Sequence, residues 1–204
     1  MDWATVSALA TGGGTLVLAG TTYASVRSAN RAARVAELSL LAGLRPLIVP
    51  SADDDRVQRV EFADDTALMV PGGCAGVEVI DDRVYVALSL RNVGSGIAVL
   101  HGGFVTEQRV GVDEHEPLER VPRLTRDLYL PPGEVGFWQA SFRSDPRRDD
   151  VRALVESGRF SVELLYGDFE GGQRMVTRIA VLREHDRWNL RVARHWQIDR
   201  DDPR

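Results

Sequence analysis

The segment Arg83–Arg91, RVYVALSLR, sets the fold class of this chain. Successive side chains of a β-strand point to opposite faces, and apolar residues here recur at every second position. The two residues Asp81 and Asp82 separate this strand from the apolar run Val77–Ile80, a spacing that favours a tight hairpin. The face of the strand expected to enter a core carries four aliphatic residues, Val84, Val86, Leu88 and Leu90.

A second hairpin is predicted between residues 160 and 182. Large side chains alternate before the turn at Gly167–Gly172, and apolar residues return from Met175 to Leu182. We expect the first arm of this hairpin to lie at the centre of the fold, buried opposite the 83–91 strand. Its core-facing side chains are Phe160, Val162, Leu164 and Tyr166.

Further short strands alternate with turn residues along the rest of the chain. One short helix is expected from Ser144-Asp145-Pro146 to Ser157, because aspartate caps helices and proline suits their first position. About eight or nine strands with one short helix predict a mainly β fold, an antiparallel immunoglobulin-like β-sandwich over residues 44–198. Residues 199–204 are predicted to be a disordered tail.

Residues 1–26 are predicted to form a transmembrane anchor. The segment Trp3–Val26 carries no charge, and as a helix it would rise about 36 Å, enough to cross a bilayer. A cleaved signal peptide and a soluble or interfacial helix are the alternatives. A signal peptide has positive charge before its apolar run, whereas Asp2 stands here. The residues expected to meet lipid include Trp3, Leu9, Leu16, Val17, Leu18 and Tyr23.

The residues after this stretch predict its orientation. Arg27, Arg31 and Arg34 follow it directly, and short flanks rich in arginine stay in the cytoplasm. We therefore expect a single-pass protein of the plasma membrane with a cytoplasmic C-terminal domain. The single cysteine, Cys74, agrees, because one thiol cannot form an intramolecular disulfide.

Residues 27–43 are predicted to continue the helix as a stalk. Gly43 ends it, and Pro46 cannot continue it. Small and apolar residues recur along the stalk at spacings of three or four. This stripe makes a homo-oligomer, formed through the anchor and stalk, a partner hypothesis beside the lipid bilayer.

Charge excludes one class of partner. The net charge is −5, and all 25 basic residues are arginine. Residues 1–37 contribute +1, so the remainder carries −6. A nucleic-acid-binding domain needs a concentrated basic face, so no nucleic-acid partner is expected.

Four short motifs carry a resemblance: Arg45-Pro46, the run from Leu90 through Asn92 to Ala98, the turn Leu130–Glu134, and Tyr166–Gly171. In this order the chain resembles a group of uncharacterised bacterial proteins with an N-terminal spanning helix, a charged stalk and a β-sandwich. The resemblance implies architecture and membrane address. It implies no activity.

Candidate chemistry is sparse. The four histidines, His101, His115, His185 and His195, are scattered, whereas metal sites show short repeated spacings. Cys74 has no base nearby in the sequence. We therefore predict no catalytic residue, no cofactor and no metal site.

Three functions remain from the sequence. The first is a membrane-anchored interaction or scaffold module that docks another membrane or cytoplasmic protein. The second is a hydrolase or other enzyme whose site on the sandwich rim uses His101, His115 and nearby acids. The third is an exported domain released from a cleaved signal peptide.

Overall fold

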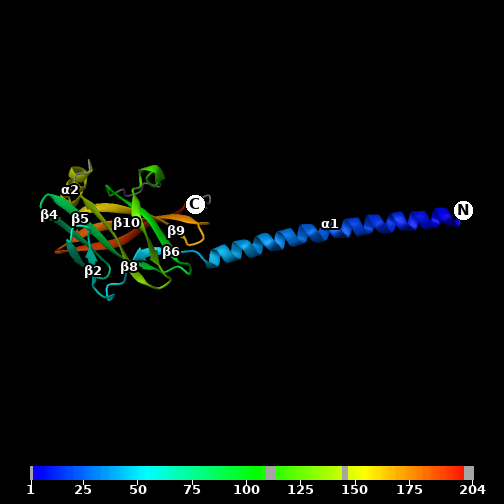
Figure 1. Cartoon of the computed structure of the whole chain (residues 1–204), viewed down its shortest axis with the longest axis horizontal. Coiled ribbons are helices and arrows are strands. Elements are labelled where there is room, and N and C mark those ends of the chain that lie inside the picture. The colour runs from blue at the N-terminus through cyan, green and yellow to red at the C-terminus, as the bar shows by residue number, and fades with distance from the viewer. Residues whose placement is uncertain (1, 109–113, 144–146, 200–204) are drawn as a thin grey trace. The chain divides into compact units, whose positions relative to one another are not determined.

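The structure is a computed structural model, and it describes residues 2–108, 114–143 and 147–199. The chain divides into two compact units, Met1–Gly43 and Leu44–Arg204 (Figure 1). The first unit is one helix, α1 (Trp3–Gly43). The second unit, which we call the β domain, holds the strands and a second helix, α2 (Arg148–Glu156).

The N-terminal helix is confirmed, but its predicted role as a spanning anchor is not supported. In the part of α1 that the structure describes, no segment is both long enough and apolar enough to cross a membrane. Glycine and threonine are interspersed among its apolar residues, which explains the low hydropathy of a segment that nevertheless carries no charge.

Among the described residues of the β domain, nine strands form one curled antiparallel sheet (Figure 1). Their order is β1-β5-β4-β11-β10-β9-β6-β7, and β8 pairs with β5. The bounds are β1 (Ile48–Pro50), β4 (Cys74–Ile80), β5 (Arg83–Asn92), β6 (Ala98–Thr106), β7 (Arg123–Leu130), β8 (Val135–Phe142), β9 (Arg159–Asp168), β10 (Arg174–Glu184) and β11 (Arg187–Gln197).

The antiparallel, mainly β prediction is confirmed, whereas the immunoglobulin-like sandwich is not. A sandwich requires two separate sheets. Here β4 pairs with β11 through Ala75–Trp188 and Cys74–Asn189. These two residue pairs join the layer around β5 to the layer around β9 and β10, so the sheet curls around one main core.

The main core contains the two predicted faces. The alternating residues of β5 and those of β9 are fully buried in one cluster, as expected, and they are Val84, Val86, Leu88, Leu90, Phe160, Val162, Leu164 and Tyr166. Both predicted hairpins form, with Ile80 opposite Arg83 in one and Leu164 opposite Thr177 in the other. The 160–182 hairpin is flanked by β6 and β11, which places it inside the sheet.

A small hairpin covers the other face of β5. It consists of β2 (Gln58–Glu61) and β3 (Ala67–Val70), which pair with each other as a separate sheet. Tyr85 and Ala87 of β5 are buried beneath it in a second apolar cluster. Strand β5 is therefore buried on both faces.

The ends of two predicted elements lie at or beside residues that the structure does not describe. The expected helix start at Ser144-Asp145-Pro146 lies outside the described residues, and α2 begins at Arg148. Asp199, which the sequence assigned to the tail, lies within the described part: its carboxylate accepts the Arg174 backbone N–H at 2.6 Å and pairs with the Arg174 guanidinium at 2.6 Å. The remaining tail residues, 200–204, lie outside the described part.

Candidate functional site

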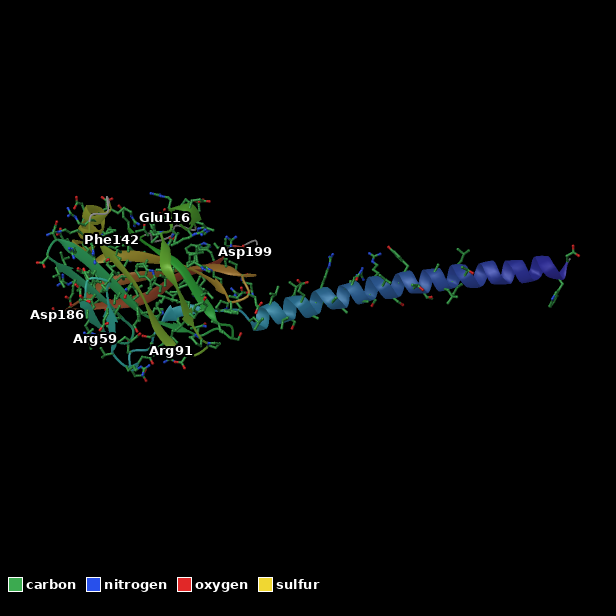
Figure 2. The ribbon with its side chains drawn as sticks, in the orientation of Figure 1. Arg59, Arg91, Glu116, Phe142, Asp186 and Asp199 are labelled. Carbon is green, nitrogen blue, oxygen red and sulfur yellow. The ribbon has the colours of Figure 1, made fainter. Side chains whose placement is uncertain are left out.

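The end of the β domain at which the chain enters from α1 holds its most connected loops, and we call it the entry end. Loop 92–97, turn 131–134 and turn 168–173 meet there, close to residues 44–47. Figure 2 shows Asp199 at this end of the domain and Asp186 at the opposite end. All four motifs that carry the resemblance therefore converge in space.

Asn92 connects these segments. Its Oδ1 accepts the backbone N–H groups of Leu47 at 3.1 Å and Gly94 at 3.0 Å. Its Nδ2 donates to the carbonyls of Gly96 at 2.7 Å and Leu130 at 2.9 Å. The amide thus uses both donors and both acceptor lone pairs while fully buried, which is the condition for a stabilising polar group in a core.

Close backbone contact fixes the residues after α1. A Cβ atom at Gly96 would lie 1.7 Å from the carbonyl oxygen of Leu44, and one at Gly94 would lie 2.4 Å from that of Arg45. Loop 92–96 therefore needs glycine at these positions to pack on the entering chain. Residues 44–47 belong to the β domain.

A hydrogen-bond chain connects β1 with β9, β10 and β11. The Ile48 N–H donates to the Tyr166 hydroxyl at 3.2 Å, which bonds the Thr177 hydroxyl at 2.9 Å. The Thr177 Oγ1 in turn lies 2.7 Å from the His195 Nδ1. Burial raises the pKa of Tyr166, so its hydroxyl keeps its proton.

An exposed apolar patch flanks these loops on the outer face of the sheet. The rings of Tyr129 and Phe169 contact each other with centroids 6.2 Å apart, yet their residues are 55% and 62% exposed. Ile97, which is 39% exposed, directly precedes Ala98, and Ala98 pairs with Asp168, the chain neighbour of Phe169. Tyr129 belongs to β7, the last strand in the sheet order.

A buried charge network lies on the same outer face, nearer the other end. Glu163 and Arg178 form an ion pair at 2.6 Å with side chains 1% and 2% exposed. Arg178 also donates to the Glu114 carbonyl at 2.6 Å, and the Glu116 N–H donates to Glu163 at 2.7 Å. The Arg178 guanidinium lies over the Trp196 ring at 4.8 Å. The network fastens the segment around Glu116, labelled in Figure 2, to the sheet.

Beside this network, a groove of about 540 Å³ runs between α2 and the end of β6. The Arg147 guanidinium stacks on the Phe104 ring at 3.9 Å and donates to the Val105 carbonyl at 2.6 Å. Carboxylates and guanidinium groups both line the groove, so its charge favours neither anions nor cations. Its charged residues are Glu107, Glu116, Arg120, Arg147 and Asp150.

The four histidines do not meet in the described part of the chain. His101 packs over Gly167, where a Cβ would lie 3.0 Å from its Nε2, and the rings of His115 and Trp196 meet edge to face with centroids 5.8 Å apart. His185 stands in the β10–β11 turn with φ of 57°. His195 bonds Thr177 on the face of β11 opposite the Trp196 side, because neighbouring strand residues point to opposite faces.

No metal site appears among residues 2–108, 114–143 and 147–199: no three His, Cys, Asp or Glu side chains there could hold an ion. Cys74 is buried, with its Sγ 3.8 Å from the Asn189 Oδ1. In the loop after β1, Asp55 pairs with Arg91, and the hydrogen bond from that guanidinium lowers the pKa of Asp55.

The residues predicted to meet lipid lie on α1. Most are strongly exposed there, namely Trp3, Leu16, Val17, Leu18 and Tyr23, and the side chain of Leu9 lies outside the described part. Arg27, Arg31 and Arg34 are also exposed on this helix. The sequence did not single out Asn92, Glu163 or Arg178, although polar residues within apolar strands are a readable signal of buried polar contacts.

Comparisons with known proteins add little. No protein-family model and no curated protein matches the chain. One similar solved structure is a β-glucosidase from Kluyveromyces marxianus, with 16% sequence identity over 61% of this chain and 14% of that chain. Its TM-score of 0.23 carries no argument about fold or function.

Proposed function

We propose that this chain is a protein-interaction module whose β domain docks a partner protein at its entry end. The proposed docking surface is the apolar patch formed by Ile97, Tyr129 and Phe169. Aromatic side chains are enriched at protein interfaces, where they bury large areas at low cost in conformational entropy.

The observation that supports this proposal is the contact between two exposed aromatic rings. Single exposed apolar residues are normal on protein surfaces and need no explanation. Tyr129 and Phe169, however, are neighbours that leave more than half of their area in water. Clustered exposed apolar residues are typical of interaction sites.

The free edge of β7 gives the patch a second means of binding. β7 ends the sheet order, so its outer edge pairs with no strand in the described residues. An unpaired edge presents backbone N–H and C=O groups that an extended partner segment can pair with. The patch would then contact alternate side chains of that segment.

The test is affinity capture by the tagged full-length protein from the cells that make it. We expect a partner that is retained by the wild type and lost with Tyr129→Ser/Phe169→Ser. Met69→Ser is the matched control, because Met69 is 62% exposed like Phe169 but lies on the β2–β3 hairpin. Equal capture by both variants would exclude the patch, and no capture by the wild type would contradict the interaction function.

Membrane attachment and a cytoplasmic β domain stay predictions from the sequence. They rest on the uncharged Trp3–Val26 stretch and on the three arginines after it, not on strong hydropathy. The measurement is extraction of the full-length protein from membranes by alkaline carbonate, where a spanning helix resists. Recovery in the soluble fraction without detergent would refute membrane attachment.

The enzyme alternative has lost the feature that suggested it. It required two histidines and a carboxylate in one pocket, whereas the described histidines lie on separate faces and turns. We therefore do not pursue a rim active site.

A further inference from the structure

Only one direction of the hydrogen-bond chain from β1 to β11 gives each of its protons an acceptor. A backbone N–H is only a donor, so at the Ile48 contact the Tyr166 oxygen must accept. The Tyr166 proton then goes to Thr177, and the Thr177 proton goes to the Nδ1 of His195. Ile48, Tyr166 and Thr177 are fully buried, which leaves water no access to replace a missing partner.

This direction sets the protonation state of His195. Its Nδ1 must be an acceptor, which requires the neutral ring with its proton on Nε2. A second proton on Nδ1 would turn that nitrogen into a donor toward Thr177. One buried hydroxyl proton, on Thr177 or on Tyr166 after reversal, would then have no acceptor. An unsatisfied buried group lowers the ratio of folded to unfolded protein about 5-fold to 150-fold.

The charges around His195 favour the same state. In the segment 44–47, the Arg45 guanidinium donates two hydrogen bonds, at 2.8 and 3.0 Å, to the side-chain oxygen of Gln197. Gln197 lies two residues beyond His195 on the same face of β11, so a positive charge stands nearby. Arg45 also interacts electrostatically with Tyr166 of β9. The carboxylate of Asp199 is engaged by Arg174.

The element most able to yield is β1. It has three residues and pairs with β5 over Ile48–Asn92, Val49–Arg91 and Pro50–Leu90. The other members of the chain belong to strands of ten or eleven residues inside the sheet. Breaking the hydrogen bond from the Ile48 N–H is therefore the smallest movement that would let water reach the buried hydroxyl proton that has lost its acceptor.

We propose that His195 is a pH-sensitive latch: the neutral ring holds β1 on the sheet, and protonation loosens β1 together with residues 44–47. The change is expected as the pH falls below about 6.5, the pH at which histidine ordinarily takes up its second proton. The inference is independent of the patch proposed above.

The test is amide hydrogen exchange of the full-length protein at pH 7.5 and 5.5, corrected for intrinsic exchange rates. We expect protection of the segment 44–50 to fall at least 5-fold at the lower pH, with β9 and β10 unchanged. His195→Ala and Thr177→Val should show low protection of this segment at both pH values. His185→Gln is the control, since His185 is exposed in the β10–β11 turn, and it should behave like the wild type.

Nitrogen NMR of the wild type covers the case in which a variant does not fold. The proposal requires the Nε2–H tautomer of His195 at pH 7.5 and a titration midpoint of His195 below about 6.5, the ordinary value for histidine. A midpoint at or above that value would overturn it, as would equal protection of residues 44–50 at both pH values.

Discussion

Replacing Glu163 by glutamine should destabilise the β domain severely. The carboxylate accepts the Arg178 Nε at 2.8 Å and Nη2 at 2.6 Å, and both side chains are buried. Glutamine keeps the volume but removes the negative charge that Glu163 places against the guanidinium. Removing one partner of a buried ion pair costs about 3–5 kcal/mol, a large share of the roughly 5–15 kcal/mol that stabilises a domain.

The assay is urea unfolding of the full-length protein, followed by tryptophan fluorescence. Glu184→Gln is the control, because the Glu184–Arg191 pair also starts on β10 but has side chains 45% and 67% exposed. Exposed pairs contribute little, so the control should change the free energy of unfolding by less than about 1 kcal/mol. A loss from Glu163→Gln no larger than that of the control would refute the reasoning.

The double variant Glu163→Leu/Arg178→Met separates charge from packing. Replacing both partners of a buried pair by apolar residues is often neutral or stabilising. Here the Glu116 N–H and the Glu114 carbonyl also lose partners. We therefore expect the double variant to be more stable than Glu163→Gln alone and less stable than the wild type.

Three further predictions concern stability, each measured by urea unfolding. Leu164→Ala should cost about 2–5 kcal/mol because the side chain is fully buried, and a loss below about 1 kcal/mol would contradict its placement in the core. Gly103→Ala should cost about 1–3 kcal/mol, since the new Cβ would lie 2.4 Å from the Trp138 indole; an unchanged midpoint would show that the sheet yields. Hydrogen bonding from Tyr85 lowers the pKa of Asp64 from its ordinary value of 3.8 to about 2. The ionised Asp64 carboxylate therefore stabilises the folded state fully above about pH 4, and this stabilisation is lost as the pH falls through about 2. Asp64→Asn should remove this part of the pH dependence of the free energy of unfolding.

The sequence predicted two central strands of the β domain well because aliphatic residues recur at every second position of β5 and large apolar residues at every second position of β9. Strands β5 and β9 have period-two patterns that leave one choice of inward face, and both faces are buried as expected. Such patterns report burial of each strand separately. They do not report which strands are neighbours.

The closure of the sheet could not be predicted for that reason. It depends on two residue pairs between β4 and β11, and nothing in Cys74 or Ala75 distinguishes a sheet-joining residue from an ordinary strand residue. A sandwich and a curled sheet therefore have the same sequence pattern here.

The candidate sites could be predicted from the sequence only in part. Glu163 and Arg178 face each other in the predicted hairpin, so their pairing follows from its register. Their burial does not, because it depends on a segment around Glu116 that lies far away in sequence. Asn92 belongs to the Leu90–Ala98 motif, but its four hydrogen bonds link residues as distant in sequence as Leu47 and Leu130.

The bonds of Asn92 to the entering chain also define where the domain can be cut or joined. Because Leu47 is held by the Asn92 side chain and the Arg45 carbonyl accepts from Ser95, the folding unit includes the residues directly after α1. A truncation that starts at Leu44 keeps these bonds, whereas one that starts at Ile48 removes them. The domain therefore carries its own attachment segment, and a different N-terminal element fused before Leu44 would keep the bonds from Asn92 to Leu47 and from Ser95 to Arg45.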